Sequence, residues 1–356
     1  MRITAALVPE KGAPFRLEAL ELADPGPDEL VVRVAACGVC QTDVHGRDDY
    51  FGIPFPCVFG HEGAGTVERV GAAVTKVRPG DRVVMTSPSC GQCAACRRGL
   101  PGYCAEARRI KFGGRLRDGR VPLGKNGSPV SGGFFQQSAF ATFSLATEGN
   151  VVRLPDELPL EVAAAFACGV NTGAGAVLNV LKPQPGSSIA VFGAGSVGLA
   201  AVMAARVAGC ATIFALDLHE NRLELARALG ATEVCKPGTR SLEGIEYSVE
   251  AAGSPRALRE AVDCLAPLGM CCLVGSARRG TEARLEMAQL QHGRHLRGCI
   301  QGDAPPAEFF PLLFELWRGG RLPVERLIAH YDFAEVNRAV ADSLSGKTVK
   351  PVLRIS

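Results

Sequence analysis

The sequence lacks the features that mark exported, membrane-spanning or nucleic-acid-binding proteins. Charged residues make up 21% of its 356 positions, the net charge is +3 and no run of like charge occurs, so nucleic acid is not an expected partner. Its longest apolar stretches are interrupted by glycine, proline or charge, which predicts no membrane span. Strand-like sequence follows Met1 directly, without a basic and then apolar leader, and this predicts a cytoplasmic protein. Repeats and low-complexity segments are absent too. With these classes excluded, the composition predicts a soluble globular protein.

The chain is long enough for two domains, and the pattern of expected strands and helices changes near residue 160. Before that point short strands are expected, and residues 109–138 read as loops and a hairpin. After a helix at 159–169, strands and helices alternate as in a doubly wound parallel sheet. The expected strands are 29–36, 65–70, 81–85, 188–192, 212–216, 247–250, 270–274 and 349–355, and the expected helices are 197–208, 220–229, 255–264, 311–318 and 334–343. We therefore predict an α/β protein whose β-rich domain is built from both ends of the chain.

Fourteen cysteines in a chain of this kind point to metal rather than to disulfides. Four of them follow the spacing C-x2-C-x2-C-x7-C, namely Cys90, Cys93, Cys96 and Cys104. Four thiolates close a tetrahedral shell around Zn²⁺ and leave no position for substrate, so this zinc is predicted to be structural. Eight other cysteines lie in apolar contexts and are expected to be buried.

A second, dispersed set of metal-ligand types consists of Cys40, His61 and Cys168. Each of them alone is more often a core residue than a ligand. Together, two thiolates and one imidazole bind Zn²⁺ and leave a fourth position open, which is the arrangement of a catalytic zinc.

A glycine-rich turn after the strand at 188–192 opens the helix at 197–208 and has the pattern G-x-G-x-x-G. This context predicts dinucleotide binding, because the glycines allow a tight turn and a close backbone approach to the pyrophosphate. Asp217 ends the next strand, where a carboxylate accepts from the adenosine ribose and disfavours a 2′-phosphate, so NAD is expected. Arg222 nearby weakens that discrimination. The predicted cofactor residues here are Gly193, Gly195, Ser196, Val197, Gly198, Asp217 and Arg222.

The motifs CGVCQTDVH, GHEGAGTVERVG, the four-cysteine lobe, CGVNTGAGA, GAGSVG and GKTVKPVL occur in that order. In this the chain resembles the medium-chain, zinc-dependent alcohol dehydrogenases nearly from end to end. The resemblance implies a GroES-like catalytic domain formed by residues 1–166 and 301–356, with a structural-zinc lobe at 88–108. It also implies a Rossmann NAD-binding domain at 167–300, and two zinc ions per chain.

The same resemblance implies roles for residues around the catalytic zinc. Glu62 would approach the metal during ligand exchange, and Asp43 would orient His61. Thr42 would hold the substrate hydroxyl and begin a proton relay that ends at His45 on the surface.

Three more residues would contact the cofactor. Thr172 would support the nicotinamide and Lys350 the pyrophosphate. Gln41 departs from the family pattern of Arg or His, and a neutral amide there should hold the pyrophosphate less strongly.

The segments around residues 112–143 and 298–340 are similar to the branch that oxidises aryl and allylic primary alcohols, such as benzyl alcohol and geraniol. Phe51, Phe134, Phe135 and Phe140 could line an aromatic pocket for such a substrate, although each is as readily an ordinary core residue.

Four alternatives stay open. A polyol dehydrogenase typically has Glu where this chain has Cys168, and a glutathione-dependent formaldehyde dehydrogenase differs in substrate. A zinc finger lacks the second half of the required spacing here, and a zinc- and NADH-binding scaffold would not turn over. We also expect a homodimer or homotetramer, formed through a sheet edge at 270–274.

Overall fold

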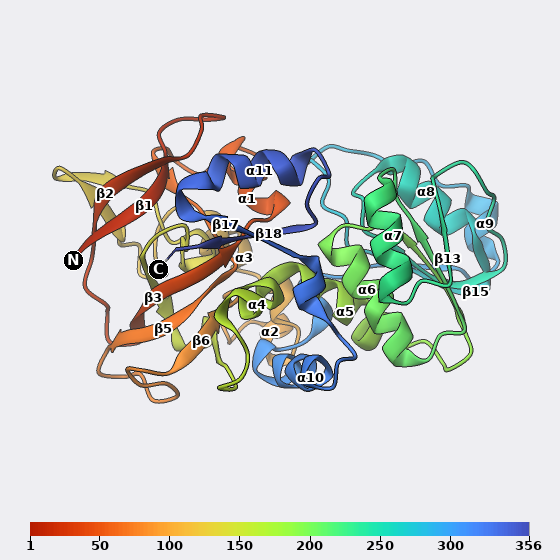
Figure 1. The fold of residues 1–356 in the computed structure, drawn as a ribbon, viewed down its shortest axis with the longest axis horizontal. Coiled ribbons are helices and arrows are strands. Elements are labelled where there is room, and N and C mark those ends of the chain that lie inside the picture. The colour runs from red at the N-terminus through yellow and green to blue at the C-terminus, as the bar shows by residue number, and fades with distance from the viewer. Residues whose placement is uncertain (356) are drawn as a thin grey trace. The chain divides into compact units, whose positions relative to one another are not determined.

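The computed structural model describes residues 1–355 and divides the chain into two compact units (Figure 1). Unit 1 comprises Met1–Cys168, Pro305–Phe314 and Ile328–Ser356, and unit 2 comprises Gly169–Ala304 and Glu315–Leu327. The first strands and the last strand of the chain therefore belong to the same unit, as their red and dark blue ribbons show.

Unit 1 is built from two sheets that are antiparallel except for one pair. The first sheet has the order β4-β1-β2-β7-β8, with strands Cys57–Val58, Arg2–Val8, Arg16–Leu22, Leu123–Lys125 and Ser128–Val130. The second has the order β10-β6-β5-β3-β18-β17, with strands Val151–Arg153, Arg82–Met85, Gly63–Val70, Glu29–Gly38, Lys350–Arg354 and Ile328–Asp332, and β9 (Phe143–Thr147) also pairs with β3. β17 and β18 are the parallel pair.

The central strand β3 explains why the core of unit 1 lies where it does. Its sequence ELVVRVAACG is apolar at almost every position, and all but two of its residues are buried. Such a run suits a strand that has neighbours on both sides, and β3 pairs with β5, β9 and β18.

The helices before residue 160 are short, as expected: α1 (Gln41–Arg47), α2 (Ala94–Arg97) and α3 (Ala107–Phe112). Unit 1 also holds α4 (Leu160–Ala165) and α11 (Val336–Leu344), and most of α10 (Pro306–Arg318).

Unit 2 carries a parallel sheet of six strands in the order β13-β12-β11-β14-β15-β16. Every neighbouring pair in it is parallel, so the predicted doubly wound sheet is confirmed. The strands are Glu233–Cys235, Thr212–Leu216, Ser188–Phe192, Ile245–Glu250, Leu265–Leu273 and His295–Gly298. Its helices are α5 (Asn171–Gly175), α6 (Ser196–Ala208), α7 (Glu220–Leu229), α8 (Pro255–Asp263) and α9 (Met287–Gln291).

The edge of this sheet is not where the sequence placed it. The predicted edge strand at 270–274 belongs to β15, which pairs on both sides, and the last strand is β16. All four β16 residues are exposed. Their sequence, HLRG, lacks the apolar alternation by which a strand is recognised.

The helix predicted at 159–169 continues through π-type turns to Leu181. By length and composition Leu160–Leu181 could cross a membrane, so the statement that every apolar stretch is too short was wrong for this segment. However, 83% of its most apolar window is buried inside the protein, as in a core helix.

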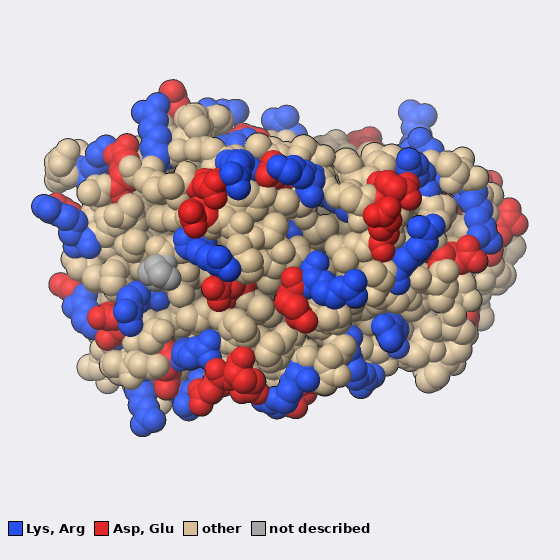
Figure 2. Space-filling view, in the orientation of Figure 1, with Lys and Arg blue, Asp and Glu red and all other residues tan. Residues whose placement is uncertain are grey.

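Figure 2 shows Lys and Arg side chains interspersed with Asp and Glu over the visible face. On this face neither sign of charge forms a separate patch.

Candidate metal and cofactor sites

Four side chains that are far apart in the sequence converge in unit 1. One ligand atom from each of Cys40, His61, Glu62 and Cys168 lies within 4.8 Å of every other. Cys40 caps α1 just after β3 ends, and His61 and Glu62 immediately precede β5. The two strands come so close here that a Cβ on Gly38 would lie 2.0 Å from Glu62 Oε2, so only glycine fits at that position.

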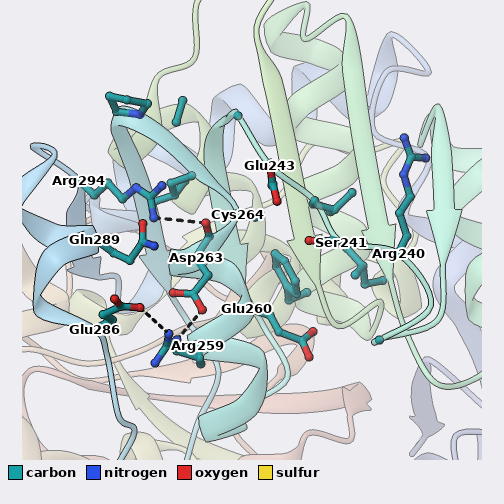
Figure 3. A pocket seen from close by; sticks show the side chains of 18 residues that line it. Arg240, Ser241, Glu243, Arg259, Glu260, Asp263, Cys264, Glu286, Gln289 and Arg294 are labelled. Atoms are coloured by element: carbon teal, nitrogen blue, oxygen red, sulfur yellow. Dashed lines mark hydrogen bonds and ion pairs between the residues drawn. The ribbon is translucent and has the colours of Figure 1, made fainter.

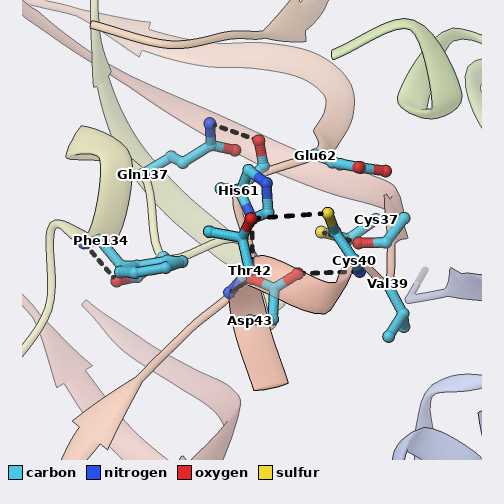
Figure 4. A network of polar contacts seen from close by, with 12 residues as sticks. Cys37, Val39, Cys40, Thr42, Asp43, His61, Glu62, Phe134 and Gln137 are labelled. Carbon is cyan, nitrogen blue, oxygen red and sulfur yellow. Dashed lines mark hydrogen bonds and ion pairs between the residues drawn. The ribbon is translucent and has the colours of Figure 1, made fainter. Parts of the chain in front are cut away.

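Asp43 fixes the direction in which His61 points (Figure 4). The His61 Nδ1 hydrogen-bonds Asp43 Oδ1 at 2.9 Å, and this carboxylate also accepts from the backbone N–H groups of Cys40 and Gly60, each at 3.0 Å. The other ring nitrogen, Nε2, is buried and finds no hydrogen-bond partner among residues 1–355. A buried nitrogen left without a partner beside two sulfurs is a metal-ligand geometry, so these residues fit Zn²⁺.

The two thiols of the cluster contact each other and shift each other's pKa in opposite directions. The hydrogen bond from Cys168 lowers the pKa of Cys40 well below its usual value, and the same contact raises the pKa of Cys168. A divalent cation bound there would replace such protons, because metal ligands must be deprotonated.

Lys350 lies beside this cluster. Its Nζ contacts both carboxylate oxygens of Glu62 at 2.8 Å, and the side chain is 1% exposed. Burial alone would lower the pKa of Lys350, but the Glu62 carboxylate outweighs burial and raises it, while burial raises the pKa of Glu62 to about 7 against the pull of Lys350. The ammonium that was expected to bind the pyrophosphate is therefore held by Glu62 in this structure.

The expected relay residues lie on α1. Cys40 Sγ is 3.8 Å from Thr42 Oγ1, which places the hydroxyl at the metal cluster. His45, one turn further on, was expected at the surface, but it is only 8% exposed. The ring of Tyr50 stacks on it with centroids 4.4 Å apart, and burial lowers the pKa of His45. Gln41, the first residue of α1, is exposed.

Aromatic rings line one side of His61. The centroid of Phe135 lies 4.6 Å from the imidazole in a stacked arrangement, and that of Phe134 lies 5.7 Å away, edge to face. Phe51 stacks on Phe112 at 4.0 Å, and both reach Phe134. Phe112 was not predicted, since nothing in its local sequence distinguishes it from a core phenylalanine.

Phe140 does not join these rings. It is fully buried and packs edge to face on Phe15 in the core of unit 1. The structure therefore places Phe140 in the core and not among the rings of the expected pocket. Between Phe135 and Phe140 the chain turns through a 3₁₀ segment and left-handed residues at Gln136 and Ser138, so the rings on either side of this turn point differently.

The segment that carries these phenylalanines is strained and held by two glutamines that the sequence analysis missed. Phe135, Gln136 and Ser138 have φ angles of 52° to 54°, which side chains other than glycine rarely adopt. The Gln136 amide donates to the carbonyls of Ile110 and Arg115, at 2.8 and 2.9 Å. Gln137 donates to the His61 carbonyl and accepts from Gly63 N–H. Buried amides thus lock the ring wall to the metal cluster, and no sequence pattern reveals such long-range bonds.

The four-cysteine lobe forms the second cluster, with all four sulfurs within 4.8 Å of one another. The sulfurs of Cys93 and Cys96 lie 3.5 Å apart and those of Cys90 and Cys96 lie 3.9 Å apart. A tetrahedral site with Zn–S bonds of about 2.3 Å separates its sulfurs by about 3.8 Å, so the spacing fits zinc. Hydrogen bonds led by that from Ala105 N–H lower the pKa of Cys93 to about 6, which favours the thiolate.

In unit 2 the glycine turn has the geometry of a phosphate-binding loop. A Cβ on Gly198 would lie 1.7 Å from the Gly193 carbonyl oxygen, so the helix can pack this closely only with glycine. Gly195 caps α6, whose first turn begins with Ser196 and Val197, without a side-chain hydrogen bond among the described residues. The free N–H groups of this helix end suit a pyrophosphate.

Asp217 is bound to this turn. Its carboxylate accepts from the N–H of Ala194 at 2.7 Å and of His219 at 2.9 Å, and Arg222 lies 3.7 Å from it. A carboxylate offers about four acceptor positions, so two backbone bonds leave room for a ribose hydroxyl. Thr172 is mostly buried on α5, which contacts α6 so closely that a Cβ on Gly173 would lie 2.0 Å from the Val197 carbonyl.

A cavity of about 790 Å³ in unit 2 holds none of these residues. It lies against α8 and α9, and its arginines are already engaged: Arg259 pairs with Asp263 and Glu286, and Arg294 donates to the Val262 and Asp263 carbonyls (Figure 3). The chemistry described above lies elsewhere.

Comparison with known proteins places this chain among zinc-dependent dehydrogenases, as the two candidate metal clusters suggest. The Alcohol dehydrogenase GroES-like domain matches residues 26–156, and the Zinc-binding dehydrogenase domain matches residues 196–317. Geraniol dehydrogenase of Castellaniella defragrans is 37% identical over 98% of this chain and 96% of its own length. The chain belongs to the zinc-dependent alcohol dehydrogenase family. It is an enzyme of the NAD-using, zinc-dependent kind, with the GroES-like and Rossmann architecture of that family.

Solved structures show the same similarity. Benzyl alcohol dehydrogenase of Acinetobacter calcoaceticus is 39% identical with a TM-score of 0.96, and both chains are covered completely. An alcohol dehydrogenase zinc-binding domain protein of Burkholderia ambifaria is 42% identical with a TM-score of 0.97, covering 100% of this chain and 99% of its own.

Proposed function

We propose that this alcohol dehydrogenase oxidises a primary aryl or allylic alcohol to its aldehyde and transfers the hydride to NAD. The observation that carries the proposal is the ring wall at His61, because Phe134 and Phe135 face the cluster that would bind the alcohol oxygen. An unsaturated group next to the carbinol carbon would lie against these rings. The similarity to a geraniol and a benzyl alcohol dehydrogenase supports the same class, since both alcohols carry an unsaturated carbon beside the carbinol.

In this proposal Cys40, His61 and Cys168 hold the catalytic zinc, and the four cysteines of the lobe hold the structural one. When bound, the catalytic zinc supplies the Lewis acidity that lowers the pKa of the alcohol. Asp43 keeps the His61 Nε2 directed at the metal through the bond to Nδ1. Lys350 holds the Glu62 carboxylate, which could approach a bound cation if that ion pair loosened.

Thr42 receives the alcohol proton in this proposal. Its hydroxyl lies beside Cys40 and can accept from the alcohol while it donates onward. His45 takes the proton at the far end of α1, where burial lowers its pKa and so keeps the ring neutral and able to accept.

The turn from Gly193 to Gly198 would hold the pyrophosphate, Asp217 the adenosine ribose and Thr172 the nicotinamide, which accepts the hydride. Gln41 and Lys350 are proposed as further pyrophosphate contacts, the latter after release from Glu62. Asp217 would repel a 2′-phosphate, and the Arg222 beside it reduces but does not remove that preference for NAD.

We also propose a cytoplasmic homodimer or homotetramer that associates through β16. This strand ends the described sheet and has no further strand beside it, which favours pairing with a second copy. Large apolar side chains are exposed around it: Leu268, Met287, Leu290, Leu296 and Ile300.

The test is a comparison of kcat/KM for NAD reduction by benzyl alcohol, cinnamyl alcohol, geraniol, cyclohexylmethanol, ethanol, sorbitol and S-hydroxymethylglutathione, with zinc quantified in the same preparation. We expect the unsaturated alcohols to exceed ethanol by at least about tenfold, because a buried ring contributes binding that ethanol lacks. Cyclohexylmethanol is the matched control for size without unsaturation. A preference for sorbitol or S-hydroxymethylglutathione would replace the proposed substrate class.

A further inference from the structure

We propose that the ammonium of Lys111 forms an anion subsite in the alcohol pocket, so that the preferred substrates are aryl or allylic alcohols with a carboxylate at the end remote from the carbinol. This inference rests on the proposed function and adds a second recognition element to it. Lys111 belongs to neither of the two metal clusters and takes no part in the steps described above.

Lys111 lies in α3 at the ring wall. Its Nζ is 5.5 Å from the centroid of the Phe135 ring, and that ring stacks on His61 at 4.6 Å. Both the ammonium and the imidazole contact the Phe135 ring, so the two are at most about 10 Å apart. A benzyl or cinnamyl group with its hydroxyl at the metal cluster spans such a distance with its far end.

The Lys111 side chain is buried, and its ammonium faces an aromatic ring. Lys111 is only 5% exposed, and the contact that its Nζ makes in the described part of the chain is with the Phe135 ring. Burial lowers the pKa of Lys111 to about 8. The negative charges of the Cys168 and Cys104 sulfurs act in the opposite direction and raise it, but burial outweighs them. An ammonium on a buried stem, in contact with a ring and with its three N–H donors directed at no carboxylate of residues 1–355, can bind an anionic group.

Gln136 fixes the position of this cation. Its side-chain amide donates to the carbonyl of Ile110, the residue before Lys111, while its backbone directly follows Phe135. The same amide reaches the Arg115 carbonyl at 2.9 Å, on the chain just after α3. The cation and the ring it faces are thus held in one geometry before any substrate arrives, as an anion subsite requires.

A carboxylate is the group that this environment would select. Lys111 is 5% exposed beside the Phe135 ring, which itself packs on Phe112, so an ammonium–carboxylate hydrogen bond is stronger there than at the surface. The rival reading is that Lys111 only balances the charge of the cysteine thiolates, for which Cys104 and Cys168 are the nearest candidates. That reading predicts an effect on zinc retention and none on substrate choice.

The experiment compares 4-(hydroxymethyl)benzoate with its neutral isostere 4-(hydroxymethyl)benzamide in the zinc-loaded wild type and in Lys111→Met. We expect the wild type to prefer the carboxylate, and the variant to lower the carboxylate-to-amide ratio of kcat/KM by about 10- to 100-fold, the contribution of a hydrogen bond to a charged group. Benzyl alcohol should be oxidised equally well by both proteins. Lys125→Met removes a half-exposed lysine from the same unit and should leave the ratio unchanged.

Met has the length of the lysine stem and removes an enclosed charge, so the variant should unfold at no lower temperature than the wild type. Lys111→Arg, which keeps the charge, should retain a preference for the carboxylate. An unchanged ratio in Lys111→Met, or a loss of zinc without a change in ratio, overturns the subsite. If the wild type oxidises neither these compounds nor benzyl alcohol, the proposed function itself fails, and the two failures are thereby distinguished.

Discussion

At the scale of single residues, the site depends on carboxylates that orient or restrain its other groups. Asp43 is completely buried and binds three groups at once, the His61 ring and two backbone N–H groups. Glu62 is held in an ion pair by Lys350. Neither role follows from local sequence, because each partner lies 17 or more residues away except for Cys40.

Asp43→Asn should weaken binding of the catalytic zinc by about 10- to 100-fold, because an amide orients the imidazole less well and lowers its basicity. Equilibrium dialysis against a graded zinc chelator, with metal analysis, should find one zinc per chain lost early and the lobe zinc retained. Asp24→Asn, at an exposed ion pair with Arg69, serves as the control. Equal retention of both metals in Asp43→Asn would show that the carboxylate does not position His61.

At the scale of elements, the cysteine lobe and the strand–turn–helix of unit 2 differ in what holds them. β11 and α6 are apolar and buried along most of their length. The lobe has little such support: its helix α2 contains no buried residue. We infer that metal binding contributes most of the stability of this lobe.

Cys93→Ala should therefore unfold residues 88–108 locally and reduce the zinc content by one ion per chain. Limited proteolysis should show new cleavage within the lobe, while Cys210→Ala, at a half-buried cysteine in neither cluster, should show none. A Cys93→Ala protein that resists proteolysis and still holds two zinc ions would mean that packing, and not metal, orders the lobe.

At the scale of the whole molecule, the exposed edge at β16 is an apolar surface that a monomer leaves in water. Leu268 and Met287 are 78% and 79% exposed, and Leu296 is 38% exposed within the strand itself. Patches of this kind beside an unpaired strand mark association sites.

Leu296→Arg should shift the protein toward monomer, since two charges would be buried against each other in a symmetric pairing of β16 strands. Sedimentation velocity over a range of concentrations measures this shift. Leu344→Arg, at a position 51% exposed on α11, should sediment as the wild type does. A wild type that is monomeric at high concentration, or a Leu296→Arg variant that remains fully associated, contradicts the proposed interface.

The sequence by itself determined the class of fold, the glycine turn and the four-cysteine cluster, because each depends on residues close together in the chain. Apolar runs of the right length specify β11 and β12, and a C-x2-C spacing brings sulfurs together in any compact loop. Its similarity to a known family also named the three ligands of the dispersed cluster.

Only the tertiary structure decided which phenylalanines face His61, that Lys350 is paired with Glu62, that β16 is the edge, and that Lys111 is buried against the Phe135 ring. These facts depend on contacts between segments distant in sequence, and on the strained backbone at Phe135 and Gln136 that directs two neighbouring side chains differently. A local sequence pattern does not reveal such contacts, because the same residues would fit equally well in an ordinary hydrophobic core.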